Sequence, residues 1–174
     1  HDYLLLRNMP KRSMQQKSPE SLRDLIAVNQ HIKLLVYTGN LTYNRGVDEI
    51  VGALVRLPDR FHLVCVGNRR AEVFGAVKKR AKELDVWSRL HFVDAVPPSV
   101  VIDLISDGDF AMIPIKNACL SYYHCLPNKL FEGMHAGLPI LASNFPDMSE
   151  VVLEENIGLV DPMTDSASIA AKIL

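Results

Sequence analysis

The chain has 174 residues, of which 48% are hydrophobic and 22% charged, and these values are typical of one globular domain with a sizeable core. Its formal net charge of -1 excludes a bulk electrostatic attraction to nucleic acid or to an anionic membrane surface. No apolar run approaches the roughly 20 residues of a membrane-spanning helix. We therefore take the chain as a globular domain that acts on something other than nucleic acid.

Short apolar runs alternate with helical stripes along most of the chain. Buried strands are predicted at residues 4–6, 34–37, 62–66, 90–93, 110–113, 139–142 and 158–160. Amphipathic helices are predicted between the later strands and at the C-terminus, at 47–55, 73–84, 100–105, 148–152 and 166–174. This alternation predicts an α/β fold: a doubly wound, Rossmann-like parallel sheet of about six strands with helices on both faces.

The first 32 residues are less regular than residues 33–174, which carry the alternating pattern. Residues 11–17 are polar and basic and are predicted to be a surface linker. A first helix is predicted at 18–28, with Ser18 as its N-cap and Pro19 as its first helical residue. The chain begins with His1 and not with Met, so we expect it to be part of a longer protein.

Two long connections follow predicted strands, at residues 39–45 and 115–127. Ligands of open α/β sheets bind outside the carboxyl ends of the strands, and we expect both connections to meet at that edge. Gly39 would let the backbone approach a ligand closely. Arg45, with free amides beside it and a helix starting at about Gly46, would favour a phosphate. The alternative is a plain loop with a solvated Arg45.

Residues 122–143 contain the most informative carboxylate of the chain, Glu132. Pro127 and Asn128 start a short helix, and Gly137-Leu138-Pro139 ends it. Glu132 then lies one turn inside a helix at the mouth of the sheet, where it could bind a ligand hydroxyl. The alternative is a surface ion pair with Lys129, three residues earlier.

Other polar residues carry weaker signals. Arg69 follows the strand at 62–66 and could contact a base or a phosphate, although a surface residue at a helix start is the simpler interpretation. The three cysteines, Cys65, Cys119 and Cys125, form no paired framework and suit a reducing compartment. Cys119, His124 and Cys125 match no zinc spacing and lack a fourth ligand, so no metal is predicted.

Together, these segments resemble the C-terminal, donor-binding domain of retaining GT-B enzymes in the glycosyl transferases group 1 family. The resemblance covers nearly the whole chain from Leu34 onward. It is carried by YTGNLTYNRGVDEIVGAL, FHLVCVGN, LHFVDAVPPSVVIDLISDGDFAMIPI, PNKLFEGMHAGLPILAS, PDMSEVV and IGLVDP. The N-terminal LLLRNMP resembles the family's interdomain strand, which would make residues 1–32 a connection and residues 33–174 the nucleotide-sugar-binding domain.

The resemblance implies a nucleotide diphosphate-sugar as donor substrate and no cofactor or metal. Arg45 and the amides after Gly39 would neutralise the diphosphate. Glu132 matches the second glutamate of the family's Glu-x7-Glu motif, which holds the ribose hydroxyls. Arg69, Val93 and Asp94 would border the base.

Two positions depart from the family pattern. His124 stands where the motif has its first glutamate, and Asn40 stands where an arginine usually follows the turn glycine. Lys129 would then supply the missing positive charge. Because of these departures, a non-catalytic nucleotide- or sugar-binding domain with decayed motifs remains an alternative, and an epimerase-like domain is a third.

The resemblance also implies partners that are not part of this chain. A hexosyl-type glycosyltransferase of this family transfers sugar, with retention, to a glycan, lipid or other acceptor bound largely by an N-terminal domain. We expect the 174 residues alone to bind nucleotide weakly and to transfer nothing. We expect a cytoplasmic protein of carbohydrate or polysaccharide biosynthesis, with a peripheral position at the inner face of the membrane left open for the longer protein.

Overall fold

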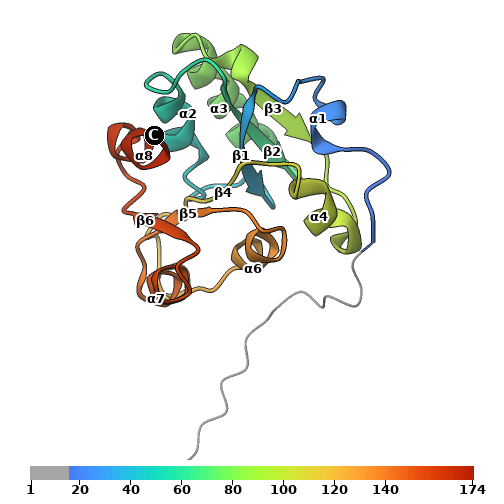
Figure 1. Ribbon diagram of the computed structural model, residues 1–174. Coiled ribbons are helices and arrows are strands. Elements are labelled where there is room, and N and C mark those ends of the chain that lie inside the picture. The colour runs from blue at the N-terminus through green and yellow to red at the C-terminus, as the bar shows by residue number, and fades with distance from the viewer. Residues whose placement is uncertain (1–15) are drawn as a thin grey trace, which may run out of the picture.

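A six-stranded sheet organises residues 16–174, the part of the chain that the computed structural model describes (Figure 1). Its strands are β1 (Lys33–Thr38), β2 (Phe61–Val66), β3 (Leu90–Val93), β4 (Phe110–Ile113), β5 (Ile140–Ser143) and β6 (Gly158–Asp161). Their order is β3-β2-β1-β4-β5-β6, and every pairing is parallel. The order reverses between β1 and β4, where open α/β sheets bind ligands. The predicted doubly wound sheet is therefore confirmed, whereas the strand predicted at 4–6 lies outside the described residues.

Helices cover both faces of the sheet, as the continuous apolar strands predict. One face packs against α2 (Val47–Leu54), α3 (Ala71–Glu83) and α8 (Ser166–Ile173), and the other against α1 (Leu22–Leu25), α4 (Pro98–Ile105), α6 (Asn128–His135) and α7 (Pro146–Glu154). Side chains of β1 alternate between the two cores, because Leu35 and Tyr37 belong to the first and Leu34 and Val36 to the second. The short helices η2 (Trp87–Arg89) and α5 (Leu120–Tyr123) lie in connections. No helix within residues 16–174 has the length and apolar character needed to cross a membrane.

The first helix is shorter than the predicted 18–28, and the predicted N-cap is wrong. Ser21, not Ser18, caps α1: its side chain accepts a hydrogen bond from the Asp24 amide at 3.1 Å. The Ser18 hydroxyl instead donates to the carbonyl of Glu20 at 2.7 Å. Ala27 adopts a positive φ of 53°, which ends the helical path soon after Leu25.

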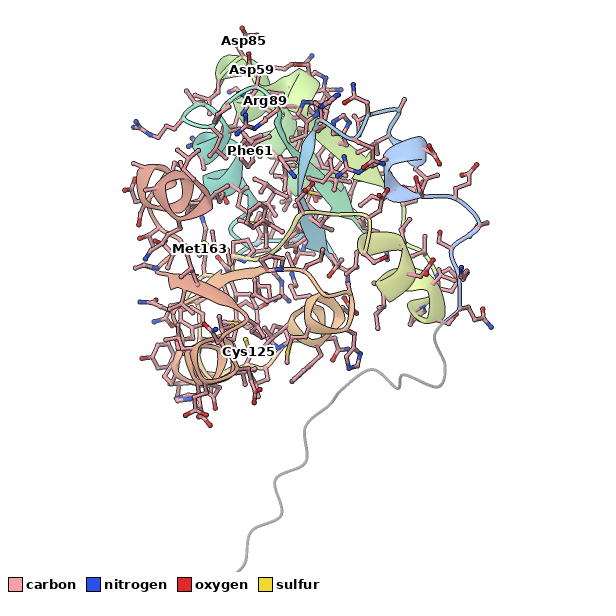
Figure 2. The ribbon with its side chains drawn as sticks, in the orientation of Figure 1. Asp59, Phe61, Asp85, Arg89, Cys125 and Met163 are labelled. Atoms are coloured by element: carbon pink, nitrogen blue, oxygen red, sulfur yellow. The ribbon has the colours of Figure 1, made fainter. Side chains whose placement is uncertain are left out.

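Charged side chains at the amino edge of the sheet bind one another. Arg23 is only 5% exposed, and its guanidinium reaches Asp109 at 2.8 Å and Asp107 at 3.3 Å. Lys33 also pairs with Asp109 at 2.8 Å. Although burial acts in the opposite direction, hydrogen bonds from Lys33, Arg23 and a backbone amide lower the pKa of Asp109. A second pair at this edge joins Arg89 to Asp59, and Figure 2 shows both at the end of the molecule opposite Cys125.

The last helix returns to the first half of the sheet. From the edge strand β6 the chain crosses back, and α8 packs beside α2 (Figure 1). Ile169 and Ile173 share one core with Ile50 of α2. The Ser166 hydroxyl donates to the carbonyl of Glu49 at 3.0 Å, which fixes the start of α8 on α2.

Candidate functional site

Two glycine turns touch each other at the carboxyl edge of the sheet. Gly39 follows β1 with a φ of 102°, and Gly67 follows β2 with a φ of 144°. A Cβ atom on Gly67 would lie 2.3 Å from the carbonyl oxygen of Gly39, so a side chain has no room there. The Gly39 amide donates to the Val66 carbonyl at 2.9 Å, which holds the turns together. Bare backbone is thereby exposed to a ligand where the order of the strands reverses.

Glu132 is held beside these turns by the end of β1. The Thr38 hydroxyl donates to Glu132 Oε2 at 2.9 Å, and Thr38 itself is only 6% exposed. Both residues line a small pocket, together with Gly39, Gly67, Val96 and Val101. Within the described residues Glu132 forms no ion pair with Lys129, so the surface pair that the sequence left open does not form. The carboxylate is therefore positioned by a neutral donor.

Lys129 lies at the same edge of the sheet, beside Tyr37 and Gly39. Its Nζ lies 3.8 Å from the centroid of the Tyr37 ring, a cation–π contact that aims the side chain toward Gly39. The Tyr37 hydroxyl donates a hydrogen bond to the carbonyl of Asn40 at 2.9 Å, and this bond holds the ring in place under Lys129. Burial, and after it the neighbouring charge of Arg45, lowers the pKa of Lys129 to about 7, although Glu132 opposes the shift.

Arg45 reaches this edge from the connection between β1 and α2. Its guanidinium carbon lies 4.7 Å from the centroid of the Tyr122 ring, on the connection that follows β4. The Lys116 amide donates to the carbonyl of Asn44 at 3.0 Å, which joins the same two connections. The expectation that they meet is therefore confirmed, although the second also contains the unpredicted helix α5. Gly46, the N-cap residue of α2, has no room for a side chain, because a Cβ atom there would lie 2.1 Å from the Pro114 carbonyl oxygen.

The other predicted residues lie around this centre with partners of their own. Arg69 pairs with Asp94, and the amide of Gly67 binds the carbonyl of Val93 at 3.0 Å, so these three predicted residues border one side of the turns. His124 Nδ1 lies 3.1 Å from Asp147 Oδ2 on α7. Asn40 accepts a weak hydrogen bond of 3.4 Å from Asn68, and Asn128 is the first residue of α6.

A larger pocket lies on another side of the connection after β1, and three cations line it: Arg45, Arg80 and Lys116. Lys116 lines it and pairs with Asp48 at 3.0 Å and with Glu49 at 2.8 Å. Arg80 donates to the Asp48 carbonyl at 3.2 Å. Lys116 is therefore neutralised by carboxylates. Arg45, which also lines this pocket, and Lys129, which borders Gly39 of the smaller pocket, form no ion pair within the described residues and are the better candidates to bind an anionic ligand.

The thiols near the site are not activated as nucleophiles. Burial raises the pKa of Cys65 to about 12 and also raises the pKa of Cys125, which lies near α6 and α7 in Figure 2. Within the described residues no group of three or more His, Cys, Asp or Glu could hold a metal ion.

Sequence reasoning missed Tyr37 and Thr38, the residues that orient Lys129 and Glu132. Tyr37 ends the predicted strand and Thr38 follows it directly, and an apolar strand pattern alone predicts no role for either at a site. The available signal was a hydroxyl side chain at the end of an apolar strand immediately before a turn glycine. Such a position points at the carboxyl edge, where a donor is useful.

The sheet, its helices and its edge define a domain of the GT-B class of glycosyltransferases. A crystal structure of WaaG, described as a glycosyltransferase of lipopolysaccharide biosynthesis, superposes with a TM-score of 0.71 at 22% identity, over 94% of this chain and 44% of that one. A structure of Anabaena HepE in complex with UDP superposes with a TM-score of 0.75 at 16% identity, over 91% and 43% of the two chains. The chain belongs to the family described as Glycosyl transferases group 1, which matches residues 32–174.

Curated relatives agree with this family. The chain is 26% identical to the lipopolysaccharide glucosyltransferase WaaG of Escherichia coli strain K12 over 158 residues, which cover 87% of this chain and 39% of the relative. It is 27% identical to glycogen synthase of Mycobacterium tuberculosis over 143 residues, 80% of this chain and 32% of the relative. The chain thus spans between about a third and two fifths of the curated relatives it matches.

Proposed function

We propose that this chain is the donor-binding half of a retaining glycosyltransferase and binds a nucleoside diphosphate-sugar at the carboxyl edge of its sheet. The observation that carries the proposal is the convergence of Arg45, Lys129 and Glu132 beside the touching turns of Gly39 and Gly67. Cations suit a diphosphate, bare backbone lets it approach, and a fixed carboxylate suits the two hydroxyls of a ribose.

Each group has a role in this proposal. Glu132 accepts hydrogen bonds from the ribose hydroxyls, while Thr38 keeps the carboxylate in place. The apolar Val96 and Val101 and the Arg69–Asp94 pair border the base. The UDP bound by HepE makes uridine diphosphate the first nucleotide to test, with guanosine diphosphate as its comparison.

Transfer in this proposal depends on stabilising the leaving group. When the bond between the anomeric carbon and the diphosphate oxygen breaks, the bonding electrons stay with the diphosphate. Arg45 and the oriented amides after Gly39 then stabilise a charge that grows in the transition state. The acceptor, a glycan, a lipid or another hydroxyl compound, is bound largely by a domain outside this chain. The 174 residues alone accordingly bind nucleotide without transferring sugar.

Calorimetric titration tests the proposal. We expect uridine or guanosine diphosphate to bind the 174-residue chain, and Glu132→Gln to weaken binding by about tenfold or more, because a charged hydrogen-bond acceptor is lost. Glu150→Gln on the exposed surface of α7 is the matched control and leaves the affinity unchanged. Failure of both nucleotides to bind a folded chain would refute the proposal. Sugar transfer by the chain alone would refute the assignment of the acceptor site to a domain outside this chain.

A second function is favoured by two residues that depart from the family pattern. Asn40 has no charge for a phosphate, and His124 is paired with Asp147. These features suit a nucleotide- or sugar-binding domain that has lost catalysis. Joined to its acceptor domain, such a protein would bind nucleotide in the titration above but would release no nucleoside diphosphate from any nucleotide-sugar supplied with acceptor.

A further inference from the structure

Lys129 differs from the other partly buried lysines at the ends of the sheet because it lacks a carboxylate partner. Lys33 and Lys116 each form ion pairs shorter than 3.0 Å. Within residues 16–174, Lys129 has no carboxylate at ion-pair distance, and its Nζ rests on the Tyr37 ring. An enclosed ammonium stabilised by an aromatic ring alone is poorly compensated for its lost hydration.

The groups that face Lys129 come from each element packed around it. Cys65 comes from β2, Tyr37 from β1, Cys125 from the connection before α6, Arg45 from the connection before α2, and Glu132 from α6 itself. Burial raises the pKa of Cys65, Cys125 and Tyr37, so these three groups are neutral near pH 7. The charged neighbours are therefore one cation and one carboxylate, and their effects on Lys129 oppose each other.

Lys129 also lies where a second phosphate ligand is needed. A Cβ atom on Gly39 would be 4.0 Å from Lys129 Nζ, so the ammonium borders the turn that leads to Asn40. Asn40 offers an amide to this region and no charge. A diphosphate near Arg45 and the Gly39 turn would bring phosphate oxygens into reach of Lys129, which is a common point-charge ligand of phosphates.

We propose that Lys129 is the second ligand of the diphosphate and takes up a proton from solvent when the nucleotide binds, an inference that rests on the proposed function above. The neutral amine gains one proton and becomes an ammonium that donates to a phosphate oxygen. Nucleotide affinity then falls as the pH rises above neutrality, because each binding event requires a proton that becomes scarcer. The lysine thereby makes donor binding sensitive to pH in a way that an arginine would not.

Proton uptake can be measured by calorimetric titration of uridine diphosphate at pH 8 in buffers that differ in their enthalpy of ionisation. The observed binding enthalpy then varies linearly with the buffer enthalpy, and the slope is the number of protons taken up. With a pKa of about 7 for Lys129 in the free chain, the wild type should take up about 0.9 of a proton more than a variant with no titratable group there. Because the nucleotide's own protonation is the same for every variant, the difference belongs to Lys129.

Two substitutions separate charge from titration. Lys129→Met should weaken uridine diphosphate binding by about tenfold or more at pH 7 and abolish the extra proton uptake. Lys129→Arg keeps a permanent charge, so it should retain more affinity than Lys129→Met and show the same reduced proton uptake. Lys79→Met removes an exposed lysine of α3 and should change neither quantity. Circular dichroism of each variant establishes that the chain is folded.

The outcomes distinguish this inference from the proposed function. Equal proton uptake by the wild type and Lys129→Met, with binding that still depends on Glu132, would overturn the role of Lys129 and leave the donor site intact. Unchanged affinity in Lys129→Met would do the same. If no nucleotide binds the folded wild type, the proposed function fails and this inference fails with it.

Discussion

Two groups of charged side chains, one at each edge of the sheet, are held in different ways. At the amino edge, Arg23 and Lys33 meet the carboxylates of Asp107 and Asp109, and each charge is balanced within the chain. At the carboxyl edge, Arg45 and Lys129 rest on aromatic rings, and Glu132 is held by a hydroxyl. Balanced charges stabilise a fold, whereas charges left without ionic partners are suited to a ligand that brings the opposite charge.

The largest expected effect is at the amino edge. We expect Arg23→Met to lower the free energy of unfolding by about 3–5 kcal/mol, because Asp107 and Asp109 lose a buried partner. Urea denaturation at pH 7 measures the change. Arg70→Met, which removes an exposed pair with Glu72, is the matched control and should cost less than about 1 kcal/mol. Equal losses in the two variants would contradict the structural role of the buried network.

The next effect concerns binding and not stability. We expect Arg45→Met to weaken uridine diphosphate binding by about 1.5–3 kcal/mol, because a charged phosphate ligand is lost, while the free energy of unfolding changes little. Calorimetric titration and urea denaturation of the same samples measure both quantities. Arg56→Met, which changes an exposed arginine after α2, should alter neither. A stability loss in Arg45→Met as large as in Arg23→Met would remove the contrast between the edges.

A smaller effect tests two histidines on adjacent strands. His62 Nδ1 lies 2.8 Å from His91 Nε2, and burial, followed by the charge of His62, lowers the pKa of His91 to about 4. The unfolded chain binds this proton at a pKa near 6.5, so stability is lost as the pH falls through the window from about 6.5 to 4. We expect a loss on the order of 1 kcal/mol at pH 5.

His91→Gln can keep a hydrogen bond to His62 without titrating in this range. The variant should therefore lose less stability than the wild type between pH 7 and pH 5, as measured by urea denaturation at each pH. His135→Gln changes an exposed histidine and should follow the wild-type curve. An unchanged acid sensitivity in His91→Gln would assign the effect to other groups.

An effect on stability of the opposite sign is expected at Lys129. Its pKa is lower in the folded chain than in the unfolded one, so its cost to stability is greatest below pH 7 and fades as the pH rises toward about 10.5. We expect Lys129→Met to stabilise the ligand-free chain at pH 7, by less than the roughly 4 kcal/mol that the lowered pKa alone corresponds to, because the lost cation–π contact offsets part of the gain. The gain should be smaller still at pH 9. A loss of stability at pH 7 would show that the charge supports the fold.

The sheet was predictable from the sequence because its strands are continuous apolar runs with the helical period between them. The helix after Ser18 was not, because Ser18 and Ser21 each have an acidic residue within the next three positions, Glu20 and Asp24, and only backbone geometry decides which serine caps. The helix α5 has four residues, which is too short for a periodic signal. Local rules fail where several short alternatives have similar energies.

The location of the site was predictable from the sequence, but the contacts between its side chains were not. Glu132, Arg45 and Gly39 were placed at one edge because parallel strands and short helices leave few other arrangements. The contacts of Glu132 with Thr38 and of Lys129 with Tyr37 join residues about ninety positions apart. No local pattern predicts such pairs, and the i,i+3 rule favoured Lys129 with Glu132 instead. Tertiary packing decided between them.

The return of α8 to α2 has a consequence for cooperativity. The last helix covers the core under Ile50, and α2 in turn begins at the connection that presents Arg45. Loss of α8 would expose that core and loosen the start of α2, so truncation far from the site would reduce ligand binding. Because the contacts between α2 and α8 join residues far apart in the sequence, we expect the chain to fold slowly for its size. Helix α8 thus stabilises α2, whose start adjoins the connection that carries Arg45.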